Sequence, residues 1–369
     1  MKIWFVLCSA VFFIGTGIWA QEGPTTTGQT VAKPRKKDAG ETDLPKIPSK
    51  LKNKGDIPEG LPSFKVDTNV VSLDVAVLDN KGHFIPGIPR GNFRVLEDGV
   101  PQQISNFGLT EAPMTVALVI EFSNLFQQYY SEGWYQTLVA AYGFVEMLKP
   151  EDYVAVVAYD MRPEILSDFS TDRRKTSEAL QRLRIASFSE SNMFDALVDM
   201  EDRMSSIEGR KAIVLIGSGL DTFSKLTFDK TRRKLQDDAV PIYALGTLQA
   251  MRERADASGR MGAIQRMDFL QADNQMRTFA KETGGMAFFP RFIGELPSIF
   301  QNIQQALRNQ YSLGYQSSNQ AKDGKFRKIK VVLVDPRTNE PLPVKDEKGK
   351  PIKYQIIAKA GYTAPREVE

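Results

Sequence analysis

The chain has 369 residues, of which 42% are hydrophobic and 25% charged, as in globular proteins large enough for two or three domains. A net charge of +3 is too small to indicate nucleic-acid binding. The single cysteine, Cys8, lies in an N-terminal apolar segment, and the single histidine, His83, lies in an expected turn. Disulfides and sulfur-ligated zinc are therefore excluded beyond that segment, and so are Ser-His-Asp and Cys-His catalytic sites.

The N-terminus indicates export. Lys2 is followed by an apolar run over residues 3–14 and then by small residues, with a cleavage point after Ala20. This pattern predicts a secretory signal peptide over residues 1–20 and a periplasmic or secreted protein. A membrane role is expected only through an uncleaved signal anchor.

Residues 21–63 are rich in Thr and Gly, then in Lys and Pro, without apolar periodicity. Such a segment cannot bury enough apolar surface to fold, so it predicts a disordered linker. Contact of its basic residues with an anionic lipid surface or polymer is the less favoured interpretation; they are Arg35, Lys36, Lys37, Lys46, Lys50, Lys52 and Lys54.

Residues 64–112 predict an N-terminal β segment. Val71, Leu73 and Val75 alternate with polar or small residues, as in a strand buried on one face. Asp98-Gly99 between two such runs is a hairpin signal.

Residues 113–309 change to alternating strands and helices. The expected strands are apolar runs at 115–120, 153–158, 212–216, 241–245 and 286–289. This rhythm predicts an α/β domain with a Rossmann-like, doubly wound parallel sheet. A polar stretch rich in Met and Arg at 249–273 is expected to be helical and to protrude.

Residues 310–365 return to period two and predict a C-terminal β segment. This segment and the N-terminal one can combine into a single β-sandwich, because an inserted domain needs its two ends close together.

Three short loops carry the candidate site. Glu121 and Ser123 follow the first α/β strand, Ser191 precedes a helix, and Ser218 and Asp221 follow a later strand. Loops at the carboxyl ends of parallel strands form the ligand-binding face of such a sheet.

Several stretches in order over residues 68–365 resemble the von Willebrand factor A-related proteins of the acidobacterial type. The stretches that carry the resemblance are Asn92-Phe93-Arg94-Val95-Leu96-Glu97-Asp98-Gly99, residues 151–156, residues 191–197, residues 211–222, Gln310-Tyr311-Ser312-Leu313-Gly314-Tyr315 and residues 360–365. The resemblance implies a domain of the von Willebrand factor A type within the fold described above.

Family members with an intact metal-ion-dependent adhesion site hold Mg²⁺ through Asp-x-Ser-x-Ser, a Thr and an Asp on these loops. By resemblance, Glu121 takes the first Asp position, Ser123 matches, and Leu125 replaces the second Ser. Ser191 stands for the Thr and Ser218 for the Asp, with Asp221 nearby.

These replacements predict a degenerate metal site. Leu125 supplies no oxygen, and the loss of an Asp removes charge that a divalent ion requires. We therefore expect no cofactor, with Mg²⁺ or Ca²⁺ as the alternative; Ca²⁺ tolerates the longer Glu121 side chain better.

Each residue also has an interpretation without metal. Ser191 is favoured as the N-cap of the helix beginning near Met193, and Ser218 as part of a tight turn. Glu121 can pair with an arginine or, like Ser123, favour the adjacent helix terminus, and Asp195 is expected to stabilise the start of its own helix.

The leading hypothesis is an exported, non-enzymatic binding protein that contacts a protein partner in the cell envelope or extracellular space. Contact is expected at the carboxyl-end face of the sheet, without a functional metal. The alternative is a divalent-cation-dependent adhesion domain. A hydrolase using Glu121 and Asp221 as paired acids, and a purely structural scaffold, are weaker alternatives.

Overall fold

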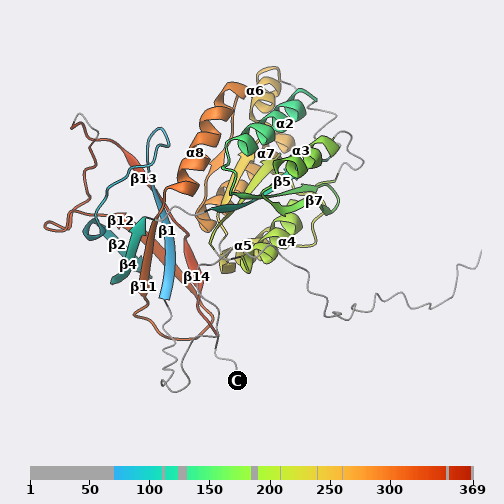
Figure 1. The fold of residues 1–369 in the computed structure, drawn as a ribbon. Coiled ribbons are helices and arrows are strands. Elements are labelled where there is room, and N and C mark those ends of the chain that lie inside the picture. Colours follow the sequence, from blue (N-terminus) through green and yellow to red (C-terminus); the bar gives the residue numbers. More distant parts are fainter. Residues whose placement is uncertain are drawn as a thin grey trace, which may run out of the picture. The chain divides into compact units, whose positions relative to one another are not determined.

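The computed structural model describes residues 70–109, 113–123, 131–183, 190–207, 209–238, 240–259, 261–345 and 349–366 (Figure 1). The expected signal peptide at 1–20 and linker at 21–63 lie outside these ranges, as does Leu125. No helix within the described ranges has the length and apolar character needed to traverse a bilayer.

A six-stranded sheet forms the centre of the α/β region. Its strands are β5 (Met114–Glu121), β6 (Tyr153–Tyr159), β7 (Pro163–Ser170), β8 (Arg210–Gly217), β9 (Ile242–Gly246) and β10 (Ala287–Phe288). They lie in the order β10-β9-β8-β5-β6-β7, and only the pair of β6 and β7 is antiparallel. Every residue of β5 is buried, as expected for a central strand covered on both faces.

Helices cover both faces of this sheet (Figure 1). They are α2 (Ser131–Glu146), α3 (Arg173–Arg182), α4 (Met193–Ser205), α5 (Phe228–Asp238), α6 (Gln249–Ala257), α7 (Ala263–Thr283) and α8 (Leu296–Arg308), with a short η2 (Ile293–Glu295). Side chains of α2, α3 and α8 share one core with Leu118, and those of α4, α5 and α7 share another with Val119. The fold is therefore the predicted Rossmann-like, doubly wound α/β fold.

The five apolar runs predicted as strands are present as β5, β6, β8, β9 and β10. The sequence did not indicate β7, because only Phe169 of this edge strand is buried and its pairing with β6 is irregular. The stretch 249–273 is helical as predicted, divided between α6 and α7 by a break at 258–262.

Eight strands outside the α/β region form two further sheets. They are β1 (Val70–Asp79), β2 (Phe93–Glu97), β3 (Val100–Gln102), β4 (Ile104–Leu109), β11 (Tyr311–Gln316), β12 (Phe326–Leu333), β13 (Tyr354–Ile357) and β14 (Gly361–Thr363), with a short η1 (Arg90–Asn92) before β2.

The sheets have the orders β13-β1-β11-β4 and β14-β12-β2-β3, so each combines strands from both ends of the chain. Leu73 and Leu313 of one sheet and Phe93 of the other belong to one buried cluster. The two β segments thus form one β-sandwich, as hypothesised. The predicted hairpin turn is present, with positive φ at Asp98 and Gly99 as a type I′ turn requires.

The strand order locates the binding crevice of the α/β region. From β5 the chain continues to β6 on one side, and it later enters β8 on the other side of β5. Ligands of open α/β sheets bind at such a switch point, beyond the carboxyl ends of the strands. Glu121 ends β5 and Gly217 ends β8, so the first and third loops meet there.

Candidate functional site

Glu121 joins the first loop to the third. Its side chain is 1% exposed. Oε1 accepts a hydrogen bond from Ser123 Oγ at 2.9 Å, and Oε2 accepts one from the Ser218 backbone N–H at 2.5 Å. Burial raises the pKa of the Glu121 carboxyl, and the hydrogen bonds from Ser218 and Ser123 oppose that rise. Both carboxyl oxygens are thus engaged by serine groups rather than by the arginine considered above.

Two residues that the sequence did not single out enclose this carboxyl. Tyr159, at the end of β6, pairs in register with Glu121 and is fully buried. Its hydroxyl has no hydrogen-bond partner among the described residues, and burial, followed by the charge of Glu121, raises its pKa. A Cβ on Gly217 would lie 2.6 Å from Tyr159 Oη and 2.7 Å from Glu121 Oε2, so only glycine fits between them.

Ser191 connects the second loop to the third. Its Oγ donates to the Leu220 carbonyl at 2.8 Å, and its backbone N–H donates to Thr222 Oγ1 at 2.9 Å. The residue preceding α4 is Asn192, so the predicted N-cap role of Ser191 is wrong. The hydroxyl is engaged by a partner about thirty residues away in sequence instead of by its own helix.

Asp221 stabilises the start of α4 from the third loop. Its Oδ1 accepts the Phe194 backbone N–H at 3.1 Å and the Ser224 hydroxyl at 2.6 Å. A carboxylate at a helix N-terminus is favourable because the N–H groups there lack intrahelical partners. Burial raises the pKa of Asp221, and these hydrogen bonds oppose the rise.

Asp195 makes the reciprocal contact. Its carboxylate accepts the backbone N–H groups of Lys225 and Leu226, each at 3.0 Å. Asp195 lies in the first turn of α4, as expected for an acid that stabilises the start of its own helix, and it also accepts the Asn192 side-chain amide at 3.3 Å. Its contacts with Lys225 and Leu226 additionally hold the loop that follows β8. Together, Asp221 and Asp195 fix this loop to α4.

Ser218 occupies a tight turn, in agreement with the interpretation without metal. Its Oγ accepts the Leu220 backbone N–H at 3.1 Å, and Gly219 next to it has φ 78°. The five residues that the sequence predicted as a degenerate metal site therefore meet at the switch point, but in two hydrogen-bonded groups. One group centres on Glu121, and the other links Ser191 and Asp221 to the rest of the third loop and to α4.

The polar groups of the site are engaged with one another. Among the described residues there is no group of three or more His, Cys, Asp or Glu side chains that could hold an ion. The oxygens of Glu121 accept protein hydrogen bonds, and Ser191 Oγ donates to a carbonyl. A divalent ion here would have to displace these bonds as well as shed its own water.

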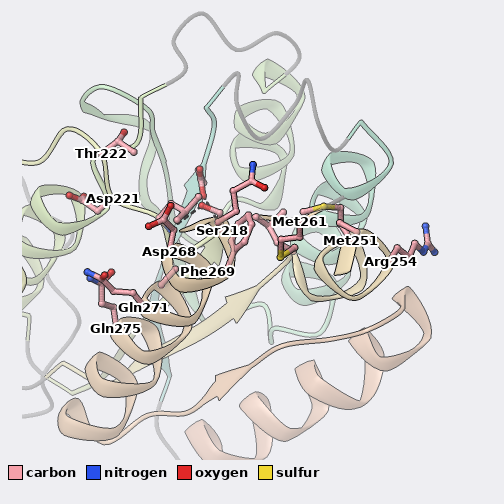
Figure 2. Close-up of a pocket in the computed structure, with 16 residues that line it drawn as sticks. Ser218, Asp221, Thr222, Met251, Arg254, Met261, Asp268, Phe269, Gln271 and Gln275 are labelled. Atoms are coloured by element: carbon pink, nitrogen blue, oxygen red, sulfur yellow. Dashed lines mark hydrogen bonds between the residues drawn. The ribbon is translucent and has the colours of Figure 1, made fainter. Parts of the chain in front are cut away.

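A cavity of about 960 Å³ opens beside the site, between the third loop and α6 and α7 (Figure 2). Glu121, Ser218 and Asp221 line one part of it. The Met- and Arg-rich stretch that the sequence predicted to protrude supplies much of the remaining wall. The sequence indicated the helices of this stretch, but not that they would enclose a cavity with the third loop.

No family model matches the chain, and no curated protein matches it. Several solved structures are similar to it at low sequence identity. The vWF domain of the type V pili tip protein Mfa5 from Porphyromonas gingivalis is 14% identical, with 53% of this chain and 95% of that chain covered, at a TM-score of 0.40. A von Willebrand factor type A protein from Catenulispora acidiphila is 10% identical, with 82% and 76% covered, at a TM-score of 0.39.

Proximal thread matrix protein 1 from the mussel byssus is 11% identical, and the match covers 54% of this chain at a TM-score of 0.41. The chain spans 50% of the length of that protein. Likenesses at these identities concern the fold alone.

Proposed function

We propose that this protein is an exported, non-enzymatic binding protein that contacts a protein partner through the carboxyl-end face of its parallel sheet. The observation that carries the proposal is the cavity at the topological switch point, beside a third loop that hydrogen bonds hold to Glu121 and to α4. A concave surface held in this way suits recognition, because less conformational entropy is lost when a partner binds.

We propose that contact at this face needs no divalent metal. Mg²⁺ binds several oxygen ligands in a tight octahedron and gives up water reluctantly. Glu121 is the most central carboxylate of the site, and both of its oxygens already accept hydrogen bonds. The alternative function, a cation-dependent adhesion domain, would require those bonds to break on metal binding.

The absence of catalysis is part of the proposal. A glycoside hydrolase needs two carboxyl groups that reach the substrate from opposite sides of a bond. Glu121 is 1% exposed, and Asp221 directs Oδ1 to a helix N-terminus. These positions support structural roles for both acids.

Export rests on the sequence. The apolar run at 3–14 with small residues before position 20 has the form of a secretory signal, and the chain has no cysteine after Cys8. We accordingly place the partner in the cell envelope or the extracellular space.

Site-specific photo-cross-linking tests the docking face. A photoreactive amino acid at Phe223 places the probe on the third loop, where the native side chain is 52% exposed. The control position is Glu151, exposed in the turn before β6 and thus at the amino end of the sheet. We expect a discrete cross-linked protein from position 223 in envelope extracts, insensitive to chelator, and none from position 151. Equal products from both positions would contradict the proposal.

A further inference from the structure

The cavity beside the third loop is unevenly charged. Three carboxyl groups line it, on Glu121, Asp221 and Asp268, against one guanidinium, on Arg254. In Figure 2 the Arg254 side chain points outward, away from the labels of Asp268 and Asp221. Without the engaged Glu121, two acids still face one distant base.

Three neighbouring arginines do not neutralise this excess, because each already pairs with an acid outside the cavity lining. Arg252 pairs with Asp273 at 2.9 Å, Arg266 with Asp256 at 2.6 Å, and Arg291 with Glu253 at 3.0 Å. Within the described ranges, the carboxylate of Asp268 has neither a hydrogen bond nor an ion pair. A cation that enters the cavity therefore meets an unpaired negative charge.

A second polar group in the cavity also lacks a partner. Gln275 of α7 is 9% exposed, and its amide makes no hydrogen bond to any described residue, although it lines the cavity. Because Gln275 lines the cavity, its amide is available to hydrogen-bond to an occupant. Its carbonyl can accept from a cationic group or a backbone N–H, and its NH₂ can donate to a backbone carbonyl.

The rest of the wall is apolar and adaptable. Leu248 is 3% exposed and Met261 is 8% exposed, and Met251 and Phe269 complete this side. Methionine side chains adapt their shape to an occupant, and long basic side chains bury their methylene stems against apolar surface. The volume is near the upper end of ligand pockets, so it admits a short segment rather than one side chain.

We propose that the cavity receives a lysine or arginine side chain carried by an extended segment of the partner protein. The methylene stem lies along Phe269 and Met251, the charged group reaches Asp268, and Gln275 hydrogen-bonds to the adjoining backbone. This inference rests on the proposed function and names the chemistry of the occupant. The positive charge of this lysine or arginine is opposite to that of the acidic group which a metal ion at this face would attract.

Methyl NMR of the full chain with ¹³C-methyl methionine tests the proposal. Met251 and Met261 line the cavity, whereas Met267 is 73% exposed on α7 and does not. The probes are blocked tripeptides, acetyl-Ala-X-Ala-amide, in which X is lysine, arginine, norleucine or glutamate. Signals are assigned with the M251L, M261L and M267L variants. We expect the lysine and arginine peptides to shift the signals of Met251 and Met261 and to leave that of Met267 unchanged.

A matched pair of variants tests the electrostatic part. Asp268→Asn should weaken binding of the lysine peptide about five-fold, the effect of losing one partly exposed charge pair. Asp256→Asn should leave it unchanged, because Asp256 pairs with Arg266 and does not line the cavity. Unchanged methyl spectra of the free variants establish that both fold normally.

Three outcomes would overturn the inference: norleucine or glutamate peptides binding as tightly as lysine, D268N binding as tightly as wild type, or no peptide shifting either cavity methionine. If any of these outcomes is found together with specific cross-linking from position 223, the inference of a basic occupant is refuted, but the proposed docking face is not. Loss of that cross-link would instead refute the proposed function.

Discussion

Glu121→Asp is the sharpest test of the interpretation that a carboxylate joins the loops. The substitution restores the residue type of an intact metal site but shortens the side chain by one methylene. The bond between Glu121 Oε2 and the Ser218 N–H spans the two strands at 2.5 Å, and a shorter side chain cannot reach both serines. Losing one charge-assisted hydrogen bond and leaving a buried donor unsatisfied should cost about 2–4 kcal/mol in unfolding free energy.

Urea unfolding followed by fluorescence measures this loss, in the chain without residues 1–20, where Trp134 is the single tryptophan. Trp134 of α2 is 8% exposed, and its ring lies 5.4 Å from that of Phe122 in the first loop, so it reports on this part of the fold. A loss of about 3 kcal/mol lowers the midpoint by ~1 M or more, because m-values in urea are roughly 1–3 kcal/mol/M. The matched control is Glu164→Asp, the same chemical change at an exposed position of β7, which should change stability by less than about 0.5 kcal/mol.

The reasoning fails if E121D and E164D unfold at the same urea concentration. In that case a shorter acid, or water, replaces the contribution of the Glu121 carboxylate to stability. It also fails if E121D regains wild-type stability on addition of Mg²⁺, since the loops would then be able to close around an ion.

Three further predictions follow from the same contacts. Gly217→Ala places a methyl group 2.6 Å from Tyr159 Oη and should lower the melting temperature by several degrees in calorimetry, whereas Gly143→Ala on α2, where a Cβ meets nothing within 4 Å, should not. Because the pKa of Glu121 lies above its ordinary value of 4.5, its neutral form favours folding. The difference in unfolding free energy between wild type and Glu121→Gln should therefore be constant below pH 4.5. Above pH 4.5 the wild type should lose stability relative to Glu121→Gln, and a difference that does not vary with pH in urea unfolding would contradict this. Titration with Mg²⁺, Ca²⁺ or Mn²⁺ should give no saturable change in Trp134 fluorescence or calorimetric heat, and a chelator-reversible signal would favour the cation-dependent alternative.

The sequence predicted the α/β framework because burial on both faces of a sheet leaves a simple pattern. The apolar runs in β5 and β8 have no other favourable environment than a covered parallel sheet. The edge strand β7 has no such constraint, since most of its side chains are partly or fully exposed. Its position is set by hydrogen bonding to β6, which leaves little pattern in the sequence.

The site was predictable in position but not in its internal contacts. The switch-point rule predicts from the sequence that Glu121, Ser191 and Ser218 lie on one face. Their partners are distant in sequence: Ser191 bonds to Leu220, and Glu121 bonds to Ser218. Local preferences suggested an N-cap for Ser191, but a hydroxyl takes whichever buried acceptor the tertiary fold offers.

The role of Tyr159 likewise could not be predicted from the sequence. Nothing in its own neighbourhood marks it, because it ends an ordinary apolar strand. It becomes part of the site only through the register that places it beside Glu121 on the adjacent strand. Gly217 is comparable, since its lack of a side chain matters only where the tyrosine hydroxyl and the carboxyl approach it.

These contacts explain how the rim can stay in shape without an ion. In a metal site of this kind the cation holds the loops together and also supplies the charge that attracts an acidic partner. Here Glu121 links β5 to the loop after β8, and Asp221 and Asp195 link that loop to α4, so protein hydrogen bonds perform the first task. Protein hydrogen bonds do not replace the positive charge that would attract an acidic partner, because the groups present here are carboxyl groups. Under the proposal that no cation binds, the face presents carboxyl groups without a compensating positive charge, which favours a basic partner over an acidic one.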